Sequence, residues 1–491
     1  MKRLISFLLV LVLALGLCAC GGASDSEATG GTETAEDPNA LRVGFGRVSI
    51  VPESMGVQIA GGDASSRLSD GYLDEVAATC IAISEGGETI LLYTIDFITV
   101  DQHVYAAQPA ISEATGVPVE NILLNTTHTH SGVSIRSNWD GVEAYRALYQ
   151  ASAVQAAKDA IADQAPATMY YGSTMTEGMV FVRHYLMNDG TTYGNGHGST
   201  ASGYKSHAYE SDGELQVIKF ARAAEDKKDI ILMNLGAHAT INNALAINSI
   251  SADWPAAARQ YVEENSDSLC AVFEAAAGDQ IPNSNIPKEA GAKYPNKHPE
   301  FGNEIGRYCV EVLSGEMTQA PGTGINLKVY NYTGKTMKEG LDDPERLLQA
   351  QELRDMSTRL GGYNRPEITT KVAEYGFASY LEASGLLSRV NYPDTYTMEL
   401  HYMDIDGVSF IFAPFEMFGV TGREIKDNSP YDMTFVITCA ENATGYHMGY
   451  LPHLYACEEK FYEYQVTKFA RGTAEDLAVK YVDLLTELKN G

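Results

Sequence analysis

The sequence has few basic residues for its size. It contains 35 lysine and arginine residues against 64 aspartate and glutamate residues, and its formal net charge is -29. Such a surface repels the phosphates of nucleic acids and the headgroups of anionic lipids. We therefore exclude nucleic acid and anionic membrane surfaces as binding partners, and we attribute the acidity to solubility.

Cysteines are also scarce, and none is spaced for a structural zinc site. No Cys-x-x-Cys pair occurs in the chain, so a zinc ribbon is excluded. The odd number beyond the N-terminal segment leaves at least one free thiol, and disulfides do not define the fold. Three of these cysteines lie in apolar runs and are interpreted as core residues. The five are Cys80, Cys270, Cys309, Cys439 and Cys457, of which the first, second and fourth are the core candidates.

An apolar run of transmembrane length is missing as well. The run from Leu4 to Leu17 is too short for a convincing membrane span and indicates a secretory signal. Its end resembles a bacterial lipobox, which implies a lipoprotein signal peptide over residues 1–20 with Cys20 as the lipidated residue. Residues 21–40 are rich in glycine, serine, threonine and acidic residues, and they are expected to form a flexible tether. We expect a protein anchored by lipid on the extracellular face of the bacterial cell membrane.

Residues 41–491 contain no internal repeat and no linker-like change of composition, so they predict one large domain. Apolar strand patterns alternate with amphipathic helix patterns along this part. The interleaving predicts an α/β fold in which helices surround a mixed β-sheet. The expected strands cover 42–51, 77–84, 89–100, the segment from 122, 215–220, 230–235, the hairpin 395–415, and 433–440. The expected helices cover 104–115, 141–163, 253–264, 299–313, 343–359, 374–387 and 473–488.

His128 and His130 are the most informative side chains of the chain. They follow the apolar strand pattern that begins at Ile122, and residues i and i+2 of an extended chain point to the same side. Neutral imidazole is the commonest protein ligand for Zn²⁺ and the usual general base near neutral pH. The pair therefore suggests a metal or proton-transfer site, with two solvated loop histidines as the bland alternative.

Three other strand patterns lead to polar side chains. His238 follows the apolar run 230–235, and Glu416 ends a strongly apolar run that begins at Val408. A buried carboxylate is uncommon unless it is paired or bound to metal. Tyr450 follows the predicted strand 433–440, but tyrosine is a rare zinc ligand, and residue type alone would not select it.

Seven short motifs occur in a characteristic order. They are Gly44-Phe45-Gly46-Arg47, Thr127-His128-Thr129-His130-Ser131-Gly132, Gly236-Ala237-His238, Ser251-Ala252-Asp253-Trp254-Pro255, Gly278-Asp279 with Pro282-Asn283, Pro414-Phe415-Glu416, and Gly449-Tyr450-Leu451-Pro452. Together they resemble the neutral, non-lysosomal ceramidases over most of residues 42–470. The resemblance implies a zinc-dependent hydrolase that cleaves the amide bond of an N-acyl lipid such as ceramide, and hence a role in sphingolipid metabolism.

The resemblance also implies a ligand set for one Zn²⁺ per chain. By motif the ligands are His128, His238, Glu416 and Tyr450, and Tyr446 competes with Tyr450 because the spacing carries an extra residue. Such a set leaves room for a water whose pKa the zinc lowers to about 7.

Catalytic positions follow from the same resemblance. His130 is expected to pass a proton to the leaving amine, and Arg183 is expected to hold the oxyanion together with the metal. Asp279 belongs to a motif of the family and is included among the catalytic residues. Asp253 has two interpretations: it orients a ligand histidine, or it caps the helix that follows, which is slightly favoured.

The chain departs from the family at Ile281, which stands where the family has an important serine. Ile281 carries neither a nucleophile nor a hydrogen-bond donor, and the neighbouring Gln280 is the side chain that would replace some of the polar contacts. The family's C-terminal immunoglobulin-like module is expected to be absent. Two alternatives therefore stay open: a zinc hydrolase with a different amide or ester substrate, and a non-catalytic surface lipoprotein that binds a ligand.

Overall fold

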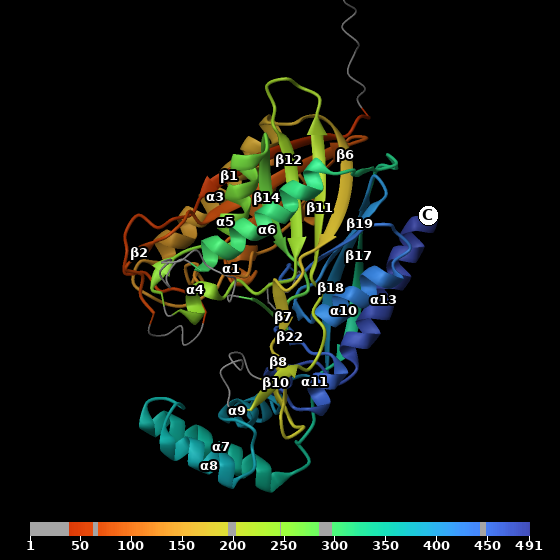
Figure 1. The fold of residues 1–491 in the computed structure, drawn as a ribbon. Coiled ribbons are helices and arrows are strands. Elements are labelled where there is room, and N and C mark those ends of the chain that lie inside the picture. Colours follow the sequence, from red (N-terminus) through yellow and green to blue (C-terminus); the bar gives the residue numbers. More distant parts are fainter. Residues whose placement is uncertain (1–38, 62–66, 195–202, 246, 284–296, 442–447) are drawn as a thin grey trace, which may run out of the picture. The chain divides into compact units, whose positions relative to one another are not determined.

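A computed structural model describes residues 39–61, 67–194, 203–245, 247–283, 297–441 and 448–491 (Figure 1). The chain divides into two units, Met1–Asp37 and Pro38–Gly491, and all of the described residues belong to the second unit. The predicted signal peptide, the tether up to residue 38, Cys20 and Tyr446 lie outside the described residues. None of the helices within the described ranges is both long and apolar enough to cross a membrane.

The larger of two main sheets is mixed. Its strands run in the order β14-β12-β11-β6-β1-β3-β4-β5, and a ninth strand, β16, pairs with β6. The pairs β12–β14 and β4–β5 are parallel, whereas the other neighbours are antiparallel. The bounds are β1 Arg42–Ser49, β3 Ala77–Glu85, β4 Glu88–Ile95, β5 Ile122–Leu123, β6 Ala165–Met175, β11 Glu214–Arg222, β12 Asp229–Leu235, β14 Ser268–Glu274 and β16 Thr318–Gln319.

A four-stranded sheet packs against one face of the larger sheet. Its order is β17 (Ile325–Lys335), β18 (Thr395–Ile405), β19 (Val408–Phe412) and β21 (Thr434–Ile437). The β18–β19 hairpin turns through two residues of positive φ, as a tight hairpin requires, at Asp406 (53°) and Gly407 (89°). The hairpin predicted over 395–415 is confirmed, with its strands ending at Phe412.

Side chains alternate between the two faces of each strand, and this builds separate cores. Ile81 and Ile83 of β3 face the four-stranded sheet, where they share a core with Phe410 and Phe435. The alternate residue Cys80 faces the helices on the opposite side. All five described cysteines are buried and unpaired, as expected for a fold that disulfides do not define.

Helices cover the outer faces of both sheets, so the fold has four layers, helix–sheet–sheet–helix (Figure 1). The larger sheet is covered by α3 (Val142–Ala162), α5 (Trp254–Asn265) and α6 (Lys297–Ser314), and the smaller sheet by α10 (Gly419–Asn428) and α13 (Thr473–Asn490). The predicted α/β fold, a mixed sheet surrounded by helices, is confirmed.

The glycines of the first motif allow α3 to lie directly on β1. A Cβ atom at Gly44 would stand 2.0 Å from the carbonyl oxygen of Ala160, and one at Gly46 would stand 2.1 Å from that of Ala156. Any side chain at these positions would force the helix away from the sheet.

Two predicted helices are wrong in their extent. The helix expected over 104–115 is two helices, α1 (Gln102–Tyr105) and α2 (Gln108–Thr115), and Pro109 lies in the first turn of the second. The helix expected over 374–387 is instead α8 (Pro366–Glu374) followed by α9 (Tyr380–Arg389). Gly376 lies between them with a φ of 67°, which ends the first helix.

The remaining elements are short, except for one helix. The helices are α4 Ile241–Ala244, α7 Pro344–Leu360, α11 Leu454–Glu458, α12 Tyr462–Val466 and the 3₁₀ turn η2 Val119–Asn121. The strands are β2 Gly71–Tyr72, β7 Val180–Val182, β8 His184–Met187, β9 Thr192–Gly194, β10 Tyr204–His207, β13 Ser249–Ile250, β15 Gln280–Pro282, β20 Glu416–Met417 and β22 Tyr450–Leu451.

Candidate metal centre

The segment that carries the first histidines is held between the ends of the two main sheets. After β5 it continues alongside β4, where Ile95 N donates to Asn125 O (3.0 Å) and Thr127 N donates to Ile95 O (2.9 Å). On its other side, the Asn125 side-chain amide donates to the carbonyl oxygen of Thr438, just beyond β21. The segment that leads to His128 is therefore fixed by hydrogen bonds to β4 through Asn125 and Thr127, and to the end of β21 through the Asn125 side chain.

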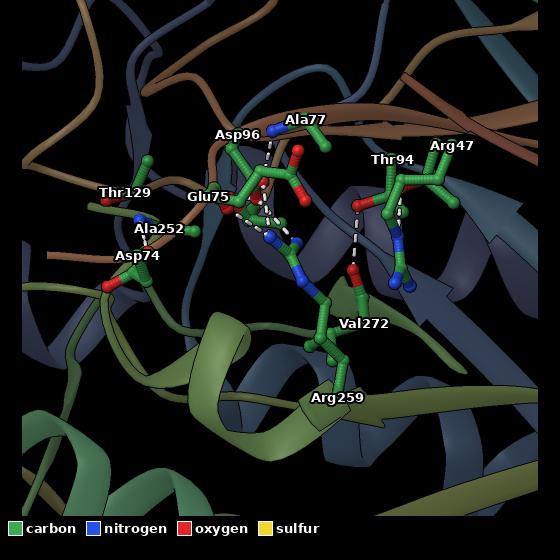
Figure 2. A network of polar contacts seen from close by, with 12 residues as sticks. Arg47, Asp74, Glu75, Ala77, Thr94, Asp96, Thr129, Ala252, Arg259 and Val272 are labelled. Carbon is green, nitrogen blue, oxygen red and sulfur yellow. Dashed lines mark hydrogen bonds and ion pairs between the residues drawn. The ribbon is translucent and has the colours of Figure 1, made fainter. Parts of the chain in front are cut away.

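A buried ion pair adds a third anchor to this segment (Figure 2). Arg259 of α5 contacts both carboxylate oxygens of Asp96, at 3.1 and 2.9 Å. Asp96 also accepts hydrogen bonds from Ala77 N (2.8 Å) and from the Thr127 hydroxyl (3.1 Å). Arg259 donates to the carbonyl oxygen of Glu75 (2.6 Å), so both buried charges have partners.

The backbone at His128 is not extended, contrary to the sequence-based expectation. Its φ is 55°, in the left-handed region, so the chain turns between the two histidines. The turn nevertheless brings their rings together, with the two Nε2 atoms 3.2 Å apart and the ring planes at 77°.

Two further predicted residues join this pair. His238 follows β12, and its Nε2 lies 3.2 Å from Nε2 of His128. Glu416 begins β20, and its Oε2 lies 3.4 Å from Nε2 of His128 and 3.3 Å from Nε2 of His238. The side chains of His128, His238 and Glu416 are all buried. Segments that are distant in sequence therefore deliver three imidazoles and one carboxylate to one point.

Backbone carbonyls set the tautomers of two of these histidines. Nδ1 of His128 donates to Ile98 O, and Nδ1 of His238 donates to Ala277 O, each at 2.6 Å. A carbonyl oxygen only accepts, so each Nδ1 carries a proton and each Nε2 is the nitrogen that faces the other ring. Fixing the second ring nitrogen in this way is typical of metal-binding histidines.

The donor separations fit a tetrahedral metal ion. With Zn–N bonds of 2.0–2.1 Å, two ligand atoms at the tetrahedral angle stand about 3.3 Å apart. The three separations among the ligand atoms of His128, His238 and Glu416 are 3.2, 3.3 and 3.4 Å. Donor types and spacing thus match a zinc site.

The electrostatic environment keeps two of the three imidazoles neutral. Burial lowers the pKa of His238 to about 4. Burial and the neighbouring His128 and His238 lower the pKa of His130 well below its usual range. Burial also opposes a charge on His128, but Cys439, Glu274 and Glu416 outweigh it and raise its pKa well above the ordinary value. Three acidic side chains therefore surround His128.

Tyr450 lies beside the cluster. It pairs with Glu416 in the parallel β20–β22 ladder, and its ring is nearly parallel to that of His238, with centroids 6.4 Å apart. The Arg183 guanidinium stands 5.4 Å from the centroid of the Tyr450 ring. Burial and Glu416 raise the pKa of Tyr450 well above its usual range, whereas Arg183 lowers it. The structure therefore places Tyr450 and Arg183 together next to His238 and Glu416.

Glu463 of α12 is a functional candidate that sequence reasoning missed. Its Oε1 accepts from Nε and Nη2 of Arg183 at 2.8 and 2.7 Å, and its Oε2 accepts from Nε2 of His184 at 3.1 Å. Burial disfavours the charge, but Arg183 and His184 lower the pKa of Glu463 to about 2. The one signal in the sequence is a carboxylate in the aromatic run from Phe461 to Tyr464.

The Gly278-Asp279 turn packs against the backbone of Glu416. A Cβ atom at Gly278 would stand 2.6 Å from the carbonyl oxygen of Glu416, so only glycine allows this approach. The carboxylate oxygens of Asp279 accept from Gly419 N (2.8 Å) and from the Tyr455 hydroxyl (2.7 Å). The Asp279 carboxylate thus connects the start of α10 to Tyr455 of α11. Its predicted catalytic role stays a prediction.

Gln280 and Ile281 point to opposite sides of β15. The Gln280 side chain is fully buried and donates to the carbonyl oxygen of Gly236 (2.9 Å), two residues before His238. Ile281 is half-buried and pairs with Phe181 of β7, two residues before Arg183. Gln280 therefore supports the backbone that leads to His238.

Asp253 caps α5. One carboxylate oxygen accepts from Trp254 N (2.8 Å) and the other accepts from Asn242 N (2.8 Å). The Nδ1 atoms of His128 and His238 have backbone carbonyls as partners. Of the two interpretations of Asp253, the helix cap is therefore the one that the contacts support.

No protein-family model matches the sequence, and no curated protein matches it. Solved structures do match the fold. The crystal structure of neutral ceramidase from Pseudomonas aeruginosa superimposes with a TM-score of 0.67 at 18% identity, covering 92% of this chain and 75% of that one. A ceramidase complexed with C2 gives the same TM-score and coverage at 17% identity. The chain thus has the fold of the neutral ceramidases, the family that its motifs resemble.

Proposed function

We propose that the protein is a zinc-dependent hydrolase that cleaves an amide bond, in an N-acyl lipid of the ceramide type. The observation that carries this proposal is the convergence of the buried Nε2 atoms of His128 and His238 and the Oε2 atom of Glu416 within 3.4 Å of one another. The likeness of the fold to that of a neutral ceramidase supports the choice of substrate.

His128, His238, Glu416 and Tyr450 are the proposed ligands of one zinc ion. Bound there, zinc would supply Lewis-acid polarisation of the amide carbonyl. Arg183 would hold the negative charge that develops on that carbonyl oxygen, because its guanidinium lies next to Tyr450 and is itself held by Glu463. His130, neutral at rest because its pKa is lowered, would first accept a proton from the attacking water at Nε2, the ring atom that faces His128, and would then pass that proton to the leaving amine.

Ile281 favours a second candidate within the same chemistry. A half-buried aliphatic side chain stands on β15 where the family that the motifs resemble has a serine, so this position offers a substrate no hydrogen bond. The same centre would then act on a different amide or on an ester. A site that has lost a hydrogen-bonding group discriminates against the substrate that needs it.

The placement of the protein in the cell is part of the proposal. Lipidation of Cys20 would hold the catalytic domain on the extracellular face of the membrane through the tether that follows. The lipid substrate would then be met at the same surface.

Metal content tests the proposal first. The purified protein should contain zinc, and His238→Ala should lose it together with amide hydrolysis. His103→Ala, which changes a half-buried histidine of α1, is the matched control and should keep both. Zinc content that is unaffected by His238→Ala would exclude the site.

Substrate class needs a separate panel. Wild-type protein and Ile281→Ser should be compared on N-acylsphingosine, on other N-acyl amides and on the matching esters. Turnover of N-acylsphingosine by the wild type supports a ceramide-type substrate. Turnover of N-acylsphingosine by Ile281→Ser but not by the wild type supports a different amide or an ester as the substrate. Zinc binding without turnover of any member would favour a ligand-binding lipoprotein.

A further inference from the structure

A second group of potential metal ligands lies behind His128, on the side of its ring away from Nε2. Glu274 is the last residue of β14 in the larger sheet, and Cys439 follows β21 in the smaller one. Thr438 N donates to Glu274 O (3.0 Å), which ties the two strand ends together. The exposed fraction is 2% for Glu274 and 1% for Cys439. Two side chains that the sequence interpretation did not connect therefore meet next to a proposed zinc ligand.

The donor atoms of this group are close enough to share an ion. The Sγ atom of Cys439 lies 3.4 Å from Nδ1 of His128, and the ligand atoms of His128, Glu274 and Cys439 all lie within 4.8 Å of one another. Cys439 has a φ of 51° and His128 a φ of 55°, a conformation that side chains with a Cβ rarely adopt. The backbone is thus bent on both sides to bring the thiol to the imidazole.

The Glu274 carboxylate needs a partner. Across the described part of the chain, no N–H or O–H group donates to either of its oxygens, and its hydrogen-bonding neighbour is the weak S–H donor of Cys439. A carboxylate buried with only a weak thiol donor and no cation is strongly disfavoured, and such a group in a folded protein points to a bound ion or to a proton. Burial raises the pKa of Glu274 to about 8, which reflects the same cost of an unbalanced charge.

We propose that Glu274, Cys439 and Nδ1 of His128 form a second metal site, in which His128 bridges two divalent ions. Thiolate, imidazole and carboxylate together select Zn²⁺ or a similar borderline ion over Mg²⁺ and Ca²⁺. The bridging role, though not the site itself, rests on the zinc centre proposed above.

Occupation of this site requires a proton balance. The Cys439 thiol proton, the Nδ1 proton of His128 and the proton that the raised pKa leaves on Glu274 at neutral pH go to solvent, and each is replaced by a bond to the metal. The hydrogen bond from Nδ1 to Ile98 O is given up at the same time, which leaves that carbonyl oxygen as a further donor beside the ion. Metal binding should therefore release protons, and its apparent affinity should rise with pH.

Cobalt is the probe that separates the two sites. The ligands proposed for the first site, His128, His238, Glu416 and Tyr450, include no sulfur, so a cobalt–thiolate charge-transfer band reports on the second site alone. Metal-free protein loaded with Co²⁺ should bind two ions per chain and show this band. Cys439→Ser should bind one ion and lose the band, and Glu274→Gln should weaken the second ion at least tenfold.

Controls distinguish this proposal from the hydrolase proposal. Cys457→Ser changes another buried thiol and should keep the band and both ions. His238→Ala should lose the first ion and amide hydrolysis while keeping the thiolate band. Wild-type protein that binds one cobalt ion without a thiolate band overturns the second site, whether or not the Cys439 variant folds, and leaves the hydrolase proposal standing. If His238→Ala keeps both the thiolate band and the wild-type rate of hydrolysis, the hydrolase proposal is wrong and the second metal site stands.

Discussion

Glu463→Gln should destabilise the protein by about 3 kcal/mol at neutral pH. Glu463 is 1% exposed and is the buried counter-ion of Arg183, which it contacts at 2.7 and 2.8 Å. Glutamine keeps the shape of the side chain but removes the charge. The guanidinium then stays buried without a balancing carboxylate, and loss of one partner of a buried pair typically costs about 3–5 kcal/mol.

The pKa of Glu463 gives the same magnitude by another route. The carboxyl has a pKa of about 2 in the folded protein, against about 4.3 for glutamate in an unfolded chain. The two pKa values differ by about two units, and each unit corresponds to about 1.4 kcal/mol, so the stabilisation is about 3 kcal/mol. Because the folded pKa is the lower one, this stabilisation is fully present above about pH 4.3 and is lost as the pH falls towards about 2.

Urea unfolding of both proteins across this pH range is the assay. The wild type should be more stable than Glu463→Gln by about 3 kcal/mol at neutral pH, and the difference should shrink towards zero near a pH of about 2. Glu458→Gln, at an exposed position of α11, is the matched control and should change little. The zinc content of Glu463→Gln should stay at the wild-type level while kcat falls, because Glu463 positions Arg183 rather than the metal. A stability difference that is constant across the pH range would refute the reasoning.

Three further substitutions separate structural from metal-binding roles. Arg259→Met leaves Asp96 buried without its cation, so a denaturant titration should show a loss of about 3–5 kcal/mol in unfolding free energy. Zinc binding should also weaken, because the Asp96 carboxylate that holds the Thr127 hydroxyl is no longer fixed. Unchanged stability would contradict this role. Asp253→Ala removes a helix cap and should cost about 1 kcal/mol with zinc content unchanged, whereas loss of zinc would restore the ligand-orienting interpretation. Tyr450→Phe should lower zinc affinity in a chelator competition without a change in the melting temperature of more than a few degrees, and unchanged affinity would remove Tyr450 from the ligand set.

Much of the fold could be predicted because most strands show apolar patterns with turn residues between them. The β18–β19 hairpin is an example, since Asp406-Gly407 marks its turn. Strand β17 has mostly exposed or half-buried side chains, so it lacks the alternation that reveals a strand. The helix predicted over 374–387 spans the real break near Gly376, because apolar residues continue through it.

Some residues of the candidate site could likewise be predicted from the sequence, and others could not. His128, His238 and Glu416 could be singled out because each follows an apolar strand pattern, and strand ends deliver functional groups. Glu463 could not, because its meaning depends on Arg183, 280 residues away in sequence. Glu274 and Cys439 both have the pattern of apolar strands, and only the packing of two sheets against each other shows that they share a contact.

The most direct test of the central claim is amide hydrolysis measured before and after removal of zinc. A fluorescent N-acyl amide should be hydrolysed by the purified protein, the rate should fall to background after treatment with a chelator, and stoichiometric zinc should restore it. Hydrolysis that persists in protein shown to be free of metal would contradict the account.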